Sequence, residues 1–187
     1  MNYQFKAGTY QFHNEPNFNY QMNRWLTFGN IPEKEIRQAA GRIKDLGDWK
    51  REFLQLARMA HEEGNILKEA CFYRAVDFFL NYSDPEKEPN YDRLVSLFHE
   101  AYEPYFRKGR IVQRSVSFEN ISLPVWYAPP SMNEISKGII LMTGGFDCYK
   151  EELVPIMLYF ADYGYHFYYF EGPGHVECVV LITRTKE

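Results

Sequence analysis

The sequence predicts an α/β protein in which a helical N-terminal segment precedes the first strands of a sheet. Apolar residues recur at helical spacing up to about residue 106. Beyond residue 108 the pattern changes to short alternating or apolar runs that end at prolines and glycines. The last of these runs have the order strand, helix, strand of a βαβ unit, whose strands run parallel. We therefore expect a helical segment at 1–108 and a partial α/β domain at 109–187.

Four helices are expected in the first segment, each with apolar residues on one face. Gly64 and Asn65 separate the second from the third as a C-cap and turn, and Pro85 helps to end the third. We interpret the apolar stripes as surfaces for helix-on-helix packing rather than as a cofactor site. The expected helices span residues 31–44, 49–63, 66–82 and 91–101.

The two helices around Gly64 are similar to one tetratricopeptide-type hairpin, because small residues recur on both. Such repeats need neighbours to bury their faces, and no second copy follows at the expected period. We therefore interpret them as a helical pair within a larger module. One alternative function stays open: a helical interaction protein that binds a partner through the hairpin around Gly64.

Four strands are expected in the second segment. Residues 110–118 alternate between apolar and polar side chains, and residues 123–130 follow them and end in two prolines, which predicts an antiparallel hairpin. A buried strand at 139–142 is followed by a helix at about 151–163, which Gly164 ends. A second buried strand, 166–170, completes the βαβ unit.

Composition gives no reason to expect a nucleic-acid or membrane partner. The formal charge is −4, no basic cluster marks a phosphate-binding face, and the apolar runs are too short to span a bilayer. Cys71, Cys148 and Cys178 are odd in number and widely spaced, which is typical of reduced thiols in a cytoplasmic protein. The five histidines show no metal-ligand spacing, and no phosphate-binding glycine motif is present, so we expect neither metal nor cofactor.

Each of the two expected parallel strands ends in a glycine turn, at 143–146 (TGGF) and at 171–174 (EGPG). In open α/β sheets, ligands gather at the carboxyl ends of the strands. Glycines there open backbone conformations that other residues avoid and bring N–H groups close to a ligand. In acyl-transfer enzymes such N–H groups stabilise the oxyanion, and losing one donor costs about 3 kcal/mol. A Gly-Gly pair alone also occurs in ordinary turns.

This order of features resembles the α/β-hydrolase family, and more closely its branch with an N-terminal helical segment, which includes pseudooxynicotine-type hydrolases and esterases related to prolyl oligopeptidases. The matching motifs are Gly-Gly-Phe-Asp at 144–147 and Glu-Gly-Pro-Gly at 171–174, where Glu171 departs from the usual Asp. The resemblance extends from about Ile36 to Gly174. It implies a small-molecule ester or carbonyl substrate and a serine acyl intermediate, without metal or organic cofactor.

The resemblance also implies roles for individual residues. The backbone N–H groups of Gly145 and Phe146 would form the oxyanion hole. Gly144, Asp147 and Glu151 would support the loop, the two acids by fixing it and capping the next helix. The ordinary alternative for both acids is a solvated helix start.

The catalytic triad of such a hydrolase is absent from this sequence. No G-x-S-x-G or G-x-C-x-G motif occurs, so no catalytic residue is assigned. The hypothesis is that the chain is an N-terminal fragment of a longer hydrolase, or the product of a truncated reading frame. A substitute pair of Cys148 and His175 is conceivable at the catalytic edge. We also expect the open sheet edge to promote self-association, for instance as a homodimer.

Overall fold

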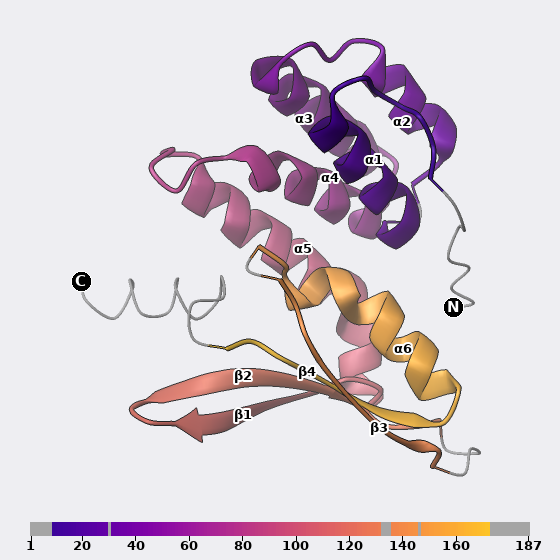
Figure 1. Ribbon diagram of the computed structural model, residues 1–187, viewed down its shortest axis with the longest axis vertical. Coiled ribbons are helices and arrows are strands. Elements are labelled where there is room, and N and C mark those ends of the chain that lie inside the picture. The colour runs from indigo at the N-terminus through magenta and orange to yellow at the C-terminus, as the bar shows by residue number, and fades with distance from the viewer. Residues whose placement is uncertain (1–8, 30, 132–135, 146, 173–187) are drawn as a thin grey trace. The chain divides into compact units, whose positions relative to one another are not determined.

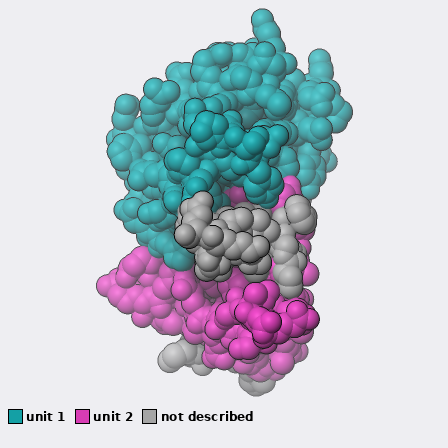
Figure 2. All heavy atoms as spheres, turned by 90° about the vertical axis from the view of Figure 1, so that its left-hand side faces the viewer, with its two compact units in different colours: residues 1–101 teal, residues 102–187 magenta. Residues whose placement is uncertain are grey.

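The computed structural model describes residues 9–29, 31–131, 136–145 and 147–172. The chain divides into two compact units, residues 1–101 and residues 102–187 (Figure 2). We call them the helical unit and the sheet unit and describe each by itself.

Five helices build the helical unit, the last of which continues into the sheet unit (Figure 1). All four expected helices are present, and α5 is longer at both ends than the sequence pattern indicated. The first helix, α1, falls in a stretch to which the sequence reading assigned no element. The helices are α1 (Pro16–Phe28), α2 (Glu33–Ala40), α3 (Leu46–Glu62), α4 (Ile66–Phe79) and α5 (Lys87–Arg107).

Local sequence explains where α3 and α4 begin and end. The Asp45 carboxylate accepts a hydrogen bond from the Asp48 N–H at 2.8 Å and so caps the start of α3. Gly64 follows α3 with a φ of 66°, a left-handed conformation that glycine adopts without strain. The Asn65 side chain then accepts from the Lys68 N–H at 3.2 Å and starts α4. The expected turn at residues 64–65 is therefore confirmed.

The apolar stripes of these helices form the core of the helical unit, as the packing interpretation predicted. Trp49 is buried against Phe18, Phe53 and Phe79, with ring centroids 4.4 to 5.0 Å apart. Its indole N–H donates to the Ala75 carbonyl at 2.8 Å, which joins α3 to α4 and satisfies the one polar atom of the ring.

The sheet unit contains four strands in the order β1-β2-β4-β3. β1 (Val112–Phe118) and β2 (Ile121–Ala128) form the expected antiparallel hairpin. β4 (Tyr165–Phe170) pairs antiparallel with β2 and parallel with β3 (Gly138–Thr143). The predicted fold class, with an antiparallel hairpin and a parallel βαβ unit after a helical segment, is confirmed.

Two helices contact the sheet, and both pack against the same face of it (Figure 1). Phe160 of α6 (Val154–Asp162) stacks on Phe167 with ring centroids 5.8 Å apart. Phe106, at the end of α5, meets Trp126 at 5.2 Å. A 3-10 turn, η1 (Lys150–Leu153), precedes α6, so the α-helix begins later than the sequence pattern indicated.

No helix among the described residues is both long and apolar enough to cross a membrane.

Candidate functional site

The two glycine turns begin beyond the ends of neighbouring strands, and Pro173 and Gly174 of the second turn lie outside the described residues. β3 and β4 run parallel, and Thr143 pairs with Phe170 at their carboxyl ends. Gly144 and Glu171 are therefore the next residues beyond two neighbouring strand ends. This is the position at which open α/β sheets bind ligands.

Glycine is required at position 144 because there is no room for a side chain, and not because of its backbone conformation. Neither Gly144 nor Gly145 has a positive φ, which corrects the expectation that these glycines adopt conformations closed to other residues. A Cβ atom on Gly144 would lie 2.2 Å from the Tyr169 hydroxyl oxygen and 2.6 Å from the Cys148 Cβ. Both distances are far below van der Waals contact, so only glycine fits here.

Gly145 is exposed. Its carbonyl accepts a hydrogen bond from the Cys148 N–H at 3.1 Å. No oxygen of a described residue accepts a hydrogen bond from the Gly145 N–H, so this donor can serve a ligand. The second expected oxyanion donor, Phe146, lies outside the described residues.

The Tyr169 side chain, which comes from β4, packs against the Gly144–Gly145 turn. The side chain is fully buried, and its hydroxyl packs against Gly144. Burial raises the pKa of Tyr169 well above its ordinary value, and the nearby Glu171, Cys148 and Glu152 raise it further. The phenol therefore stays neutral over the physiological range and acts as a rigid support for the turn.

A buried charged cluster ties the loop after Gly145 to the end of β4. The Glu171 carboxylate accepts a hydrogen bond from the Lys150 N–H at 3.3 Å, so it links the start of η1 to the residue that follows β4. The Lys150 ammonium pairs with Glu151 at 3.0 Å and lies 5.3 Å from the centre of the Trp126 ring. All four side chains are buried.

The structure assigns different roles to the acids that follow the turn. Glu151 is buried and its carboxylate pairs with the Lys150 ammonium, so its side chain is not solvated. The helix cap comes from Glu152, whose carboxylate accepts from the Tyr149 N–H at 3.1 Å. Asp147 is exposed.

We expect Glu171→Ala to lower the free energy of unfolding by about 1–3 kcal/mol, because it leaves the buried Lys150 N–H without its acceptor. Glu171→Gln keeps an oxygen at that position and should lose less. Urea denaturation of both variants checks this. An alanine variant as stable as the parent would show that the link contributes nothing.

The conceivable thiol–imidazole pair is not brought together in the described part of the chain, because His175 lies outside it. Cys148 is half-buried behind Gly144. The Nδ1 atom of His166 lies 2.7 Å from the Tyr127 hydroxyl, on the face of the sheet that α6 does not cover. Within the described residues, no group of three or more His, Cys, Asp or Glu side chains could hold a metal ion.

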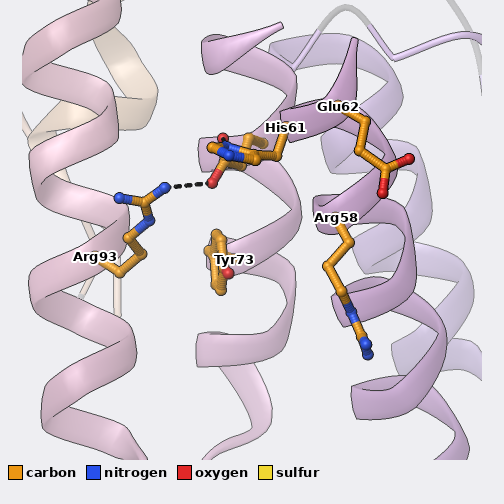
Figure 3. Close-up of a pocket in the computed structure, with 6 residues that line it drawn as sticks. Arg58, His61, Glu62, Tyr73 and Arg93 are labelled. Atoms are coloured by element: carbon orange, nitrogen blue, oxygen red, sulfur yellow. Dashed lines mark hydrogen bonds and ion pairs between the residues drawn. The ribbon is translucent and has the colours of Figure 1, made fainter. Parts of the chain in front are cut away.

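A hollow in the helical unit lies next to the hairpin around Gly64. It has a volume of about 310 Å³ (Figure 3). Its buried acid, Glu69, is already paired with Arg93 at 2.7 Å and with His61 at 3.0 Å. Because Glu69 already has these partners within the protein, it does not need a charged ligand. The exposed Gly145 turn is therefore the better candidate site. It is lined by Arg58, His61, Glu62, Glu69, Tyr73 and Arg93.

No protein-family model and no curated protein matches this sequence. Solved structures do match. Two structures of AbyA5 are each 24% identical, with TM-scores of 0.58 and 0.55; they cover 76% and 74% of this chain. The fold is α/β-hydrolase-like. A structure of 2,6-dihydroxy-pseudo-oxynicotine hydrolase is 20% identical with a TM-score of 0.49, over 81% of this chain and 45% of its own.

The chain spans 41% of the length of AbyA5. At this identity the likeness establishes the α/β-hydrolase-like fold and not an activity. It agrees with the resemblance read from the two glycine motifs. The turn of this fold could be located from the sequence, but three residues that hold it, Lys150, Glu152 and Tyr169, could not. Only Tyr169 lies near the carboxyl end of a strand, whereas Lys150 and Glu152 lie in η1.

Proposed function

We propose that this chain is the N-terminal portion of an α/β-hydrolase that acts on a small-molecule ester or another carbonyl compound. In this proposal the Gly144–Gly145 turn binds the oxyanion through the N–H of Gly145, joined by that of Phe146. The nucleophile, acid and base come from further polypeptide. The three thiols suit a cytoplasmic protein.

One observation carries this proposal: the exposed Gly145 N–H at the carboxyl end of a parallel strand. No described oxygen accepts from it, while Tyr169 and the Glu171–Lys150 link fix the turn beneath it. A donor fixed before the reaction costs no reorganisation when charge develops on the substrate oxygen. The α/β-hydrolase-like fold and the partial coverage of AbyA5 add support.

We expect no saturable hydrolysis of p-nitrophenyl acetate by the 187-residue polypeptide alone, because its sequence has no G-x-S-x-G nucleophile. The assay is initial-rate kinetics with and without a serine-directed phosphonofluoridate. Saturable turnover abolished by that reagent would contradict the proposal. Mass spectrometry of the native gene product adds a second test: the proposal expects a species well above 22.3 kDa.

A second candidate is a helical interaction protein that uses the hairpin around Gly64. The hollow beside that hairpin favours it, since Tyr73 offers an aromatic surface between two arginines (Figure 3). Partner binding that survives deletion of residues 108–187 would support this candidate, and binding lost with that deletion would count against it.

A further inference from the structure

Residues 10–13, which precede α1, belong to no helix or strand and are bound along that helix (Figure 1). We call them the strap. The Asn23 side chain accepts from the Tyr10 N–H at 2.7 Å and donates to the Tyr10 carbonyl at 2.9 Å. Asn19, one turn earlier in α1, accepts from the Phe12 N–H at 2.7 Å and from the next N–H at 3.2 Å. Both asparagines therefore bind main-chain groups of the strap.

The spacing of the two asparagines fits an extended chain. Four residues of an α-helix rise about 6 Å, and two residues of an extended chain span about the same distance. Because Asn23 binds Tyr10 and Asn19 binds Phe12, the strap runs antiparallel to α1 and covers one helical turn with two residues. Side chains two residues apart in an extended chain point the same way. The Tyr10 and Phe12 rings accordingly stack, with centroids 5.7 Å apart.

Arg37 of α2 contacts both the main chain and a ring of the strap. Its Nη1 donates to the Gln11 carbonyl at 3.2 Å, and its guanidinium lies 5.0 Å from the centre of the Phe12 ring. An ion pair with Glu33, one turn earlier in α2, joins Nε to the carboxylate at 2.7 Å and helps to orient the guanidinium. We call the two asparagines and Arg37 the clamp.

The sequence that the clamp holds occurs twice in the chain. Tyr-Gln-Phe stands at residues 10–12, in the strap, and again at residues 3–5, seven positions earlier. Residues 3–5 lie outside the described part of the chain. Both copies place two aromatic residues two positions apart, which is the spacing of the stacked rings in the strap. The chain therefore carries a second segment with the features that the clamp contacts.

We propose that the clamp is a binding site for extended peptide segments of the type Tyr-x-Phe, which the strap occupies here and for which residues 3–5 are a second ligand. The five hydrogen bonds from the clamp end on main-chain atoms, which every peptide carries. In the recognition of extended peptides, such bonds give affinity and alternate side chains give specificity. The stacked rings and Arg37 supply the specificity. This site does not depend on the proposed hydrolase activity.

The strap can be exchanged for another segment without disrupting a helix or a sheet. Tyr10 and Phe12 are half-buried, Gln11 is exposed, and the strap pairs with no strand among the described residues. Because the strap is tethered to α1, its effective concentration at the clamp is in the millimolar range. A free peptide has to compete with it. Weakening the strap should therefore reveal the affinity of the clamp for a free peptide.

Fluorescence polarisation with a labelled peptide of residues 1–7 (MNYQFKA) tests the proposal on the full 187-residue chain. In a cleared variant, proline replaces both aromatic residues of each Tyr-Gln-Phe copy, which removes the rings and the N–H groups that the asparagines bind. We expect it to bind the peptide at least tenfold more tightly than the parent. Adding Asn23→Ala removes two hydrogen bonds and should weaken binding at least fivefold. Asn17→Ala, exposed in α1, is the matched control and should change nothing.

Circular dichroism should show that the cleared variant keeps its helices. No binding by the folded cleared variant would overturn the proposal, and so would equal binding of a peptide with alanine for both aromatic residues. An affinity unchanged by Asn23→Ala would place the peptide elsewhere and would also overturn it. In the parent chain, the same peptide at about 10 mM should displace the strap and shift the NMR signal of the Asn23 side-chain amide. An unshifted signal there would contradict the proposal even if the cleared variant does not fold.

Discussion

Gly144→Ala is expected to lower the free energy of unfolding by about 3 kcal/mol. The added methyl group would meet the Tyr169 hydroxyl oxygen at 2.2 Å and the Cys148 Cβ at 2.6 Å. Tyr169 is fully buried, so neither ring nor backbone can move aside without disturbing the sheet. Guanidinium denaturation measures the loss.

Two further variants separate this clash from a general effect of glycine replacement. Gly145→Ala is the matched control, because the nearest atom to its new Cβ is 3.7 Å away, and we expect a change below about 1 kcal/mol. Tyr169→Phe removes the closer of the two clashing atoms and should partly rescue Gly144→Ala in a double-mutant cycle. Equal losses for both alanine variants, or no rescue, would show that space at Gly144 is not the constraint.

Helices with clear boundary signals could be predicted from the sequence, whereas α1 could not. Gly64 and Asn65 mark the junction of α3 and α4, and the structure uses both in those roles. In α1, the buried residues Phe18, Met22 and Trp25 do follow helical spacing. Two asparagines, Asn19 and Asn23, lie between them, and these weak helix formers make the pattern less clear. Burial of the apolar face outweighs those propensities.

The location of the candidate site could be predicted, but the reasons for its residues could not. The βαβ pattern placed the two glycine turns together. Gly144 leaves no room for a side chain because Tyr169, which is distant in sequence, packs against it. The residues around Gly144 therefore do not show whether glycine is needed for its small size or for an unusual φ. Glu151 and Glu152 are adjacent, and the sequence does not show which of them caps the helix. In a 3-10 helix, side chains three residues apart lie directly above one another, so Glu152 and not Glu151 lies next to Tyr149.

Gly145→Pro is expected to lower kcat of the complete hydrolase by about 10²–10³, because proline has no backbone N–H. The loss should fall on kcat more than on KM, since the oxyanion exists only after the substrate carbonyl is attacked. Gly145→Ala keeps the N–H and meets no close neighbour, so it should lose far less. Circular dichroism and denaturation of both variants separate a chemical effect from unfolding.

This pair of variants tests the central claim, that the main-chain donor of Gly145 stabilises the oxyanion, most directly. The measurement is kcat for p-nitrophenyl acetate with the chain extended by the coding sequence that follows Glu187. A loss of at least a hundredfold in folded Gly145→Pro, with most of the rate kept in Gly145→Ala, is the predicted result. A folded proline variant that retains the parent kcat would contradict the claim.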